Sequence, residues 1–247
     1  MRPRLFICLI VVAFLSACGS DRSLPKTPAG TFPPPDPTAD AALAQKITLT
    51  KKDLTTPIDA VQPPDSVKFN SGGTGGVAAA CGLLNDEDPT SFTITAQASG
   101  PVLGENPNTS FAKYVIGGVR FFDAASVAAR DVAVHQSPNS ELCLRRLYEP
   151  LFAQILGAQW APEKTTTKLE IVSEKGLSSI RITGTGSANR QATSPTLLIS
   201  FATVDRAEIV VVQAAVDSVP STDTARQLSD VLNKKATSVI PQATPKP

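Results

Sequence analysis

The first 18 residues constrain this chain more than any other segment, because they decide in which compartment the remainder folds. Arg2 and Arg4 precede an apolar run over residues 5–15, and the segment ends in the sequence LSAC at 15–18. A basic start, a short apolar run and small residues before a cleavage point form a secretory signal. The run is shorter than the roughly 20 apolar residues that a stable transmembrane helix needs. We therefore expect residues 1–17 to be a signal peptide that is removed, and the rest to fold outside the cytoplasm.

The sequence LSAC resembles the lipobox of bacterial lipoproteins, in which a diacylglyceryl group is attached to the cysteine thiol before the peptide is cut in front of it. For this chain, the resemblance implies a lipid anchor on Cys18, which holds the protein at the extracytoplasmic face of the cell membrane. Each buried CH₂ of an acyl chain contributes about 0.8 kcal/mol to membrane binding, so two or three long chains form a firm anchor. The alternative is an ordinary signal peptide that is cut after Ala17.

The chain has four cysteines, and its first 18 residues contain two of them. Cys8 leaves with the signal peptide and Cys18 carries the lipid, so Cys81 and Cys143 remain. Two cysteines in an oxidising compartment predict a disulfide, with a pair of buried free thiols as the alternative. A bridge that closes a loop of about 60 residues contributes roughly 3 to 4 kcal/mol to stability in the chain-entropy model.

The charge balance argues against nucleic acid as a partner. Removal of residues 1–17 takes away two of the 23 basic side chains and none of the 22 acidic ones, which leaves 21 against 22 and a net charge near −1. Nucleic-acid binding depends on a surplus of basic side chains that neutralise phosphates. The remaining length, about 230 residues, is enough for one medium-sized domain and a tether.

Proline content divides the rest of the chain into three parts. Residues 18–42 are dense in proline and poor in apolar side chains, so we expect a disordered tether behind the lipidated end. Residues 43–240 carry apolar periodicities and are expected to form a single extracytoplasmic domain. The last segment, 241–247, is again rich in proline and is expected to be a disordered tail.

Two kinds of apolar periodicity occur within the domain, which is typical of a mixed fold. Alternating or continuous apolar runs predict strands at 92–95, 114–122, 168–173, 178–185, 196–204 and 207–216. Spacing of three and four residues predicts helices at 124–136, after Pro138 and from residue 222 or 223, with Pro150 kinking the second or starting another. Tight turns favour antiparallel pairing. The predicted fold class is α+β, an antiparallel sheet of four to six strands with helices packed on one face and one disulfide.

The last two predicted strands contain apolar runs without alternation, at 197–199 and 209–212. Such strands are expected to be buried on both faces, since an exposed apolar edge would aggregate. We expect the helix that carries Leu147, Leu151 and Ile155 to cover one face together with the final helix. The other face is left to the N-terminal segment or to a partner.

The order of these elements resembles a known kind of domain. It runs through "LTKKDLTTPI", a strand, "FFDAASVAA", "SELCLRRLYEPLF", the hairpin "LLISFATVDRAEIVVVQAAV" and the closing helix "ARQLSDVLNKKA". Over about residues 43–240 it resembles extracytoplasmic domains of actinobacterial lipoproteins and of receptor kinases, and is similar to the sensor domain of mycobacterial serine/threonine kinases and to the Mog1/PsbP-like sandwich. The resemblance implies a cleft that binds a ligand, without known catalysis. The kinase sensors carry two disulfides, whereas this chain has cysteines for one.

His135 is the only histidine, so a catalytic triad or a histidine-rich zinc site would have to use it. It falls near the end of the helix predicted at 124–136, where a cationic side chain suits the helix dipole. We expect His135 at the surface or at this helix end and not as a catalytic base. Zinc sites built on two or three histidines are excluded by number. The sequence therefore predicts no metal and no cofactor.

Other polar segments have simpler interpretations than catalysis. The glycine run at 72–76 lacks the Lys-Ser/Thr of a P-loop, and the acidic residues at 86–88 lack EF-hand spacing. Glu170 and Glu174 are a candidate carboxylate pair for glycoside hydrolysis, but Glu170 alternates with apolar neighbours and is expected to face solvent. No G-x-S-x-G sequence occurs, and the stretch at 184–187 is interpreted as a strand end.

Three functional hypotheses follow from these features. The leading one is a membrane-anchored lipoprotein whose domain binds a small-molecule, lipid or protein ligand and catalyses no reaction. The first alternative is a carrier of lipids or other apolar molecules in the cell envelope, which needs a cavity between sheet and helices. The second is an envelope hydrolase, against which the single histidine argues. The sequence does not identify the ligand-binding residues.

Overall fold

The structure is a computed structural model that describes residues 35–54, 58–67, 69, 76–81, 93–104, 113–156, 160–162, 167–174, 177–188 and 191–240. The expected signal peptide, Cys18, the glycines at 72–75, the acidic residues at 86–88 and the tail at 241–247 lie outside these residues. The described elements belong to one compact unit, Pro33–Gln242.

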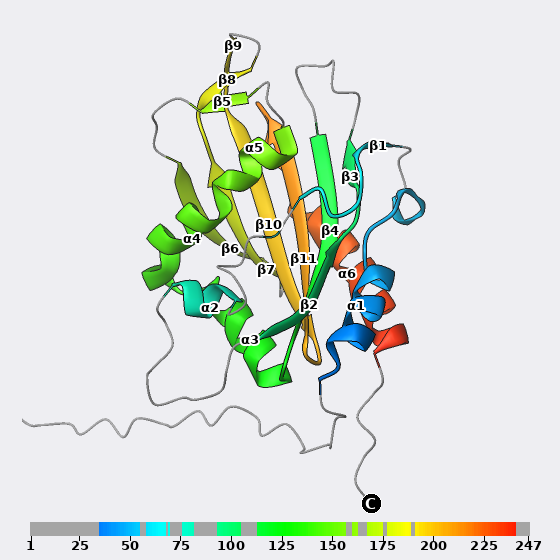
Figure 1. Cartoon of the computed structure of the whole chain (residues 1–247). Helices are drawn as coiled ribbons and strands as arrows, with labels where there is room; N and C mark the ends of the chain where they lie inside the picture. The colour runs from blue at the N-terminus through cyan, green and yellow to red at the C-terminus, as the bar shows by residue number, and fades with distance from the viewer. Residues whose placement is uncertain are drawn as a thin grey trace, which may run out of the picture. The chain divides into compact units, whose positions relative to one another are not determined.

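An antiparallel sheet of eight strands organises this unit (Figure 1). Its main path runs β1-β3-β4-β11-β10-β7-β6, and β2 also pairs with β4. The bounds are β1 Asp59–Gln62, β2 Ile94–Ser99, β3 Val102–Gly104, β4 Lys113–Phe122, β6 Lys168–Glu174, β7 Leu177–Thr183, β10 Pro195–Val204 and β11 Ala207–Val216. The predicted α+β class is confirmed. The strand count exceeds the expected four to six because β1 and β3, of four and three residues, are too short to leave a periodic signal.

The hairpin of β10 and β11 forms as the sequence predicts. The two strands pair from Pro195 with Val216 to Val204 with Ala207, and Asp205 and Arg206 make the turn. Asp205 has a positive φ of 55°, a conformation that aspartate tolerates in turns. Neighbours flank both sides of the hairpin, since β11 also pairs with β4 and β10 with β7.

Helices pack on both faces of the sheet. Their bounds are α1 Pro37–Lys46, η1 Lys51–Asp53, α2 Gly76–Ala80, α3 Ala125–Val134, η2 Pro138–Ser140, α4 Glu141–Tyr148, α5 Pro150–Leu156 and α6 Thr222–Val239. Pro150 starts a separate helix, α5, as one of its two expected effects. A second, small sheet joins β5 Trp160–Pro162, β8 Gly186–Ala188 and β9 Gln191–Thr193. Within the described part of the chain, no helix has the length and apolar character to cross a membrane.

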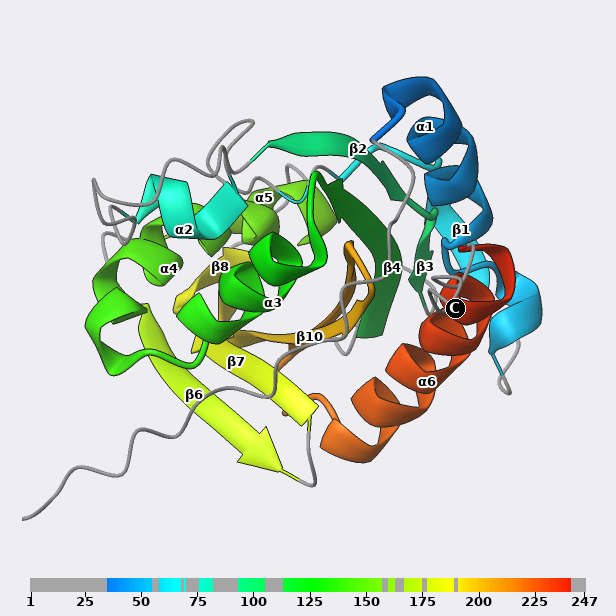
Figure 2. The ribbon, with the colours of Figure 1, turned by 90° about the horizontal axis from the view of Figure 1, so that it is seen from below.

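The position of the final helix differs from the expectation. Helices α3, α4 and α5 lie on one side of the sheet, and α6 lies on the other with α1 (Figure 2). The reason is the alternation along β11. Val210 and Val212 join the core under α3 to α5, whereas Ile209 and Val211 join the core under α6. One strand therefore supplies two hydrophobic cores, and each core needs its own helical layer.

Helix α1 begins inside the segment that the sequence analysis assigned to the tether, so the boundary at residue 42 is wrong. Asp36 caps the helix by accepting bonds from the backbone N–H groups of Thr38 and Ala39, and Pro37 occupies the first turn. The buried Asp40 forms an ion pair with Arg206 in the turn between β10 and β11. A proline read as a breaker is here the first residue of a helix, and the fold starts about six residues earlier.

The expected disulfide is present. Cys81, directly after α2, is bonded to Cys143 in α4, with their Cα atoms 5.6 Å apart. The bridge links two segments that are 62 residues apart in sequence. It fastens the short helix α2 to the layer formed by α3, α4 and α5.

Replacing Val211 with Asp should unfold the domain or cost several kcal/mol, because an unpaired carboxylate would enter a core in which Val211 is 0% exposed. Thr203→Lys, which places a charge at an exposed position of the same hairpin opposite Glu208, is the control and should change stability little. Thermal melting followed by circular dichroism measures both. A Val211→Asp variant that melts within a degree or two of wild type would contradict the sheet arrangement.

Replacing both Cys81 and Cys143 with alanine should lower the free energy of unfolding by roughly 3 to 4 kcal/mol, since the reduced chain regains loop entropy when it unfolds. Denaturant titration measures the loss, and reduction of the wild-type protein should reproduce it. Thiol labelling of the denatured, unreduced wild type should find no free thiol at these two positions. Two labels there would show that the bridge does not form.

Candidate functional site

A pocket of about 470 Å³ lies between the first half of α6 and the ends of β4 and β11. Its apolar wall comes from η1 and the residues after it, from the two strands and from α6. Members of this wall include Leu54, Ile58, Val115, Ala215, Leu228 and Val231. The polar lining includes Asp53, Lys113, Gln213, Thr224 and Gln227. We call this space the α6 pocket. A volume between 300 and 1,000 Å³ and a mainly apolar lining with few polar groups are typical of small-ligand sites.

The loop between β11 and α6 shapes one end of the α6 pocket. Gln213 on β11 donates a hydrogen bond from Nε2 to the backbone carbonyl of Ser221 at 3.1 Å. Ser221 is in turn the N-cap of α6, because its hydroxyl accepts from the backbone N–H of Thr224. Val219 in the same loop is 67% exposed and lines the pocket. Gln213 thus fixes where α6 starts relative to the sheet.

The opposite wall is held by an ion pair. Lys235 donates from Nζ to Asp53 Oδ2 at 2.6 Å and to the backbone carbonyl of Thr48 at 2.9 Å. Asp53 also accepts bonds from the backbone N–H and hydroxyl of Thr50, which closes a capping box around η1. Burial opposes ionisation of Asp53, but the bonds from Lys235 and Thr50 outweigh it and lower its pKa. Asp53 is therefore a carboxylate that already has its partners.

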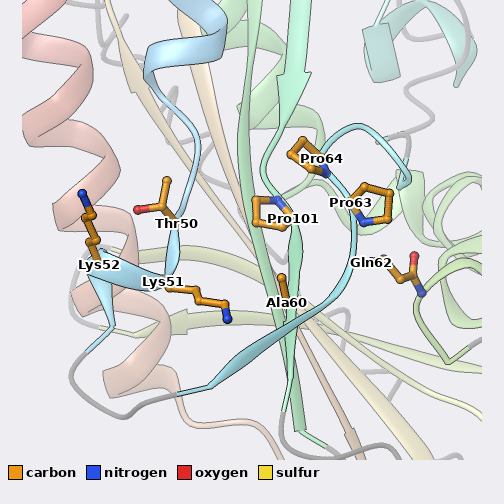
Figure 3. Close-up of a pocket in the computed structure, with 8 residues that line it drawn as sticks. All are labelled: Thr50, Lys51, Lys52, Ala60, Gln62, Pro63, Pro64 and Pro101. Carbon is orange, nitrogen blue, oxygen red and sulfur yellow. The ribbon is translucent and has the colours of Figure 1, made fainter.

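A wider hollow lies on the other side of the same segment (Figure 3). It has a volume of about 680 Å³ and is lined by Lys51, Lys52, Pro63, Pro64 and Pro101 among others. In Figure 3 the side chain of Lys51 extends toward Ala60 on β1, whereas Lys52 points away from the prolines. The lining contains no carboxylate or histidine. This hollow therefore provides contacts at the surface and no enclosed site for a reaction.

The opposite face of the sheet contains a buried ionic network. Arg120 on β4 and Glu208 on β11 are register partners, and Arg120 Nη2 lies 2.6 Å from Glu208 Oε2. The same nitrogen lies 3.3 Å from Oδ2 of Asp131 on α3. All three side chains are 0% exposed. We call Arg120, Asp131 and Glu208 the ionic network.

His135 lies at one of its two expected positions, the end of the helix, and not at the other, the surface. His135 follows α3, as expected, but it is 0% exposed. Its Nε2 lies 2.6 Å from the hydroxyl of Tyr148, and its ring stacks on Phe201 at 3.7 Å between centroids. Burial and the nearby charge of Arg120 hold the pKa of His135 well below its usual value. His135 is a neutral part of the core.

Burial also changes the protonation of the ionic network. It raises the pKa of Glu208 to about 8, although Arg120 acts in the other direction. For Arg120, burial disfavours the charged form, but Glu208 and Asp131 outweigh it and the pKa is raised. Arg120 therefore remains a cation while Glu208 is readily protonated. A buried cation with two carboxyl groups needs only one of them ionised to reach neutrality.

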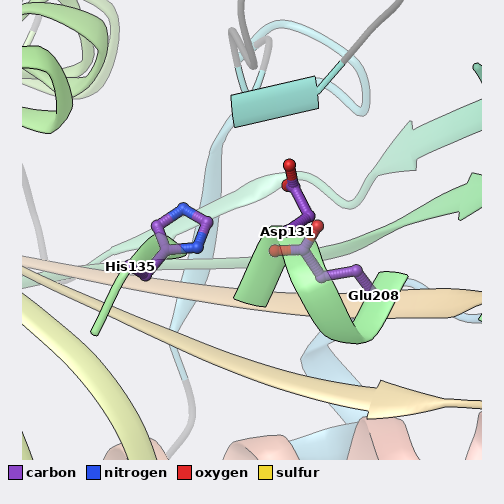
Figure 4. Close-up of side chains that lie close together, drawn as sticks. All are labelled: Asp131, His135 and Glu208. Carbon is purple, nitrogen blue, oxygen red and sulfur yellow. The ribbon is translucent and has the colours of Figure 1, made fainter. Parts of the chain in front are cut away.

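Asp131, His135 and Glu208 each offer a ligand atom within 4.8 Å of the others, which is a possible metal-binding arrangement (Figure 4). One contact opposes a metal ion here. The guanidinium of Arg120 already forms ion pairs with Asp131 and Glu208. A metal ion would have to displace this cation. We interpret the arrangement as structural.

The first residue of helix α2 lies against Asp131 of this network. Gly76 at its start has a φ of 71°, and a Cβ placed there would lie 2.7 Å from Oδ1 of Asp131. Glycine is therefore required twice, for its backbone conformation and for the close approach. Cys81 at the other end of α2 is tied to α4. The disulfide thus holds the segment that lies against the ionic network.

The carboxylate pair that the sequence suggested for glycoside hydrolysis lies apart from the α6 pocket and the ionic network. Glu170 is exposed, as expected, and pairs with Arg181 on the neighbouring strand at 3.1 Å. The side chain of Glu174 is outside the described set. The sequence analysis missed Arg120, Asp131 and Glu208. The sequence does show one basic and one acidic residue within two otherwise apolar strands. That these residues are partners becomes evident only when the register of β4 and β11 is known.

No family model matches the sequence, and no curated protein matches it. Among solved structures, the chain is similar to the extracellular domain of PknH from Mycobacterium tuberculosis, with a TM-score of 0.31 and 11% sequence identity. The likeness covers 57% of this chain and 64% of that one, so the chain spans less than two thirds of that domain. At this TM-score the likeness does not test the expected relation to kinase sensor domains, which stays a prediction. Lipoprotein character and actinobacterial origin stay predictions.

Replacing Glu208 with Gln should flatten part of the pH dependence of stability. Because the folded-state pKa, about 8, is above the ordinary value of 4.5, the stability contributed by protonated Glu208 is present at low pH and is lost as pH rises through 8. The stability of wild type relative to Glu208→Gln should therefore fall between about pH 4.5 and 8. Denaturant titrations of both proteins across this range measure the difference in their free energies of unfolding. The contribution of His135 cancels in this difference because both proteins contain it.

Glu170→Gln is the matched control for this measurement, since Glu170 is exposed on a strand of the same sheet. Its stability difference from wild type should stay nearly flat over the same range. If the free energies of unfolding of wild type and Glu208→Gln changed in parallel with pH, Glu208 would be ionised in the folded protein over the whole range.

Proposed function

We propose that this chain is an exported bacterial lipoprotein whose extracytoplasmic domain binds a small ligand in the α6 pocket and catalyses no reaction. The observation that carries the proposal is the pocket itself, about 470 Å³ with an apolar wall and a few polar groups. It lies between sheet and helix, which is also where the lipid-carrier alternative requires a cavity.

The distribution of ionisable groups supports a binding role. The sole histidine is in the core on the other face of the sheet, with its ring between Tyr148 and Phe201. Asp53 is the carboxylate in the lining of the α6 pocket, and it already accepts hydrogen bonds from Lys235 and Thr50. General acid–base catalysis needs a group whose proton is free to move to a substrate. Neither Asp53 nor His135 meets that requirement.

The membrane anchor rests on the sequence. The LSAC sequence at 15–18 supports lipidation of Cys18, and the proline-rich stretch between Cys18 and α1 suits a spacer. The first described helix begins at Pro37, so about 18 residues separate it from the lipid. A spacer of this length would let the α6 pocket open away from the bilayer surface or toward it.

Replacing Cys18 with Ala should move the protein from the membrane fraction to the soluble fraction, because no acyl chain would be attached. Fractionation of cells that express each form, followed by immunoblotting, measures this. Cys8→Ala, in the segment expected to be removed, is the control and should leave the protein in the membrane. Retention of the Cys18→Ala variant at wild-type level would contradict lipidation.

Replacing Thr224 with Trp should abolish ligand binding, because the indole would fill the mouth of the α6 pocket from an exposed helix position. Thr237→Trp, at an exposed position on the same helix outside the pocket, should bind as wild type does. The three forms are incubated with bacterial envelope extract and their bound mass is read by native mass spectrometry. A wild type that retains no added mass would contradict the proposal.

A further inference from the structure

We propose that the ligand of the α6 pocket is a single-chain anionic amphiphile, with its apolar chain between α6 and the sheet and its anionic group at Lys113. This inference rests on the proposed function, because it names the ligand class of the same pocket. It follows from three properties of the site: an apolar interior, one uncompensated positive charge and a volume suited to one chain.

The interior of the α6 pocket is apolar where α6 faces the strands. Leu228 and Val231 on α6 stand opposite Val115 on β4 and Ala215 on β11, and Leu54 completes the wall. Leu228, Val115 and Leu54 also pack in or against the hydrophobic core beneath α6. An apolar chain inserted here would continue that core. Each of its buried CH₂ groups would gain the usual hydrophobic stabilisation.

The charges at the edge of the pocket are unequal. Asp53 is paired with Lys235 at 2.6 Å, so this acid and base cancel. Lys113, the first residue of β4, is exposed and has no ion pair or side-chain hydrogen bond within the described part of the chain. The first turn of α6 lines the same pocket, but Asp223 in that turn offsets the helix dipole, so the positive charge comes from Lys113. The lining therefore offers an anion a positive site and no free carboxylate.

Lys113 stands at one end of the apolar surface. It pairs in register with Ala215 on β11, and Val115, two residues along β4, pairs with Gln213. Side chains two residues apart on a strand point to the same face. An anionic group at Lys113 would thus be followed, toward the middle of the sheet, by the apolar contact with Val115. A ligand that is charged at one end and apolar along its length matches this order.

The volume favours one chain. A CH₂ group takes roughly the space of a water molecule, about 30 Å³, so a pocket of about 470 Å³ holds on the order of 15 such groups. One medium-length acyl chain fits this space, whereas the two long chains of a membrane diacyl lipid exceed it. The carboxylate of a fatty acid and the phosphate of a monoalkyl phosphate share the required chemistry, and the experiment separates them.

The experiment measures binding of defined amphiphiles to the chain without residues 1–18. All described helices and strands lie within the compact unit Pro33–Gln242, so this form retains the whole domain. Calorimetry uses octanoate, decanoate, dodecanoate, dodecyl phosphate and neutral dodecanol, each below its aggregation concentration. We expect affinity for the carboxylates to rise about fourfold per added CH₂. Dodecanoate or dodecyl phosphate, or both, should bind about fivefold more tightly than dodecanol.

The variant Lys113→Gln removes the charge and keeps a polar, unbranched side chain that is one atom shorter. It should weaken the anionic ligands about fivefold, leave dodecanol unchanged and remove most of the salt dependence of binding. Lys168→Gln is the control, because Lys168 is likewise the exposed first residue of a strand, at the far edge of the sheet. It should bind as wild type does. Thr224→Trp should abolish binding of every chain.

The outcomes separate this inference from the proposed function. If dodecanol binds as well as dodecanoate and Thr224→Trp abolishes both, the pocket binds ligands but the anionic class is wrong. Equal affinities of Lys113→Gln and Lys168→Gln for the anions would likewise overturn the role of Lys113. If none of these amphiphiles binds, the inference fails, while the envelope-extract measurement decides the proposed function by itself.

Discussion

The burial of β11 on both faces is the constraint on which the rest of the structure depends. Val210 and Val212 face one core, and Ile209 and Val211 face the other. A strand of this kind cannot end a sheet or leave a face to water, so it lies in the middle, between β4 and β10. Two helical layers follow from the same alternation, α3 to α5 on one face and α6 with α1 on the other.

The two faces differ in how tightly they are closed. Under α3 to α5, Arg120 forms ion pairs with Asp131 and Glu208 inside the protein, while Nε and Nη1 of Arg120 have no hydrogen-bond partner among the described residues. A buried ionic group costs desolvation free energy, so this arrangement is tolerated only because all three members are held in place. Breaking it leaves an unpaired charge. The disulfide from Cys81 to Cys143 limits the motion of α2, which keeps this face structural.

Sequence reasoning predicted the features that local patterns encode. The β10–β11 hairpin, the separate helix at Pro150 and the disulfide follow from periodicity, backbone chemistry and cysteine number. The features that it missed depend on pairing across the sheet. Arg120 faces Glu208 only in the observed register, and His135 is buried only because Phe201, far along the chain, stacks on it. The α6 pocket was equally invisible, since its wall combines four separate segments.

Helix α6 closes a core along its whole length and lines the α6 pocket with its first half. Leu232 and Ala236 are fully buried against the sheet, whereas Thr224 and Gln227, in the first two turns, line the α6 pocket. The bond from Gln213 to Ser221 fixes the start of the helix, and the bonds from Lys235 to Asp53 and Thr48 fix its second half against the segment before β1. A helix held at both ends cannot collapse onto the strands between them. The pocket is therefore a consequence of how α6 is attached, and an apolar chain would fill space that the attachments keep open.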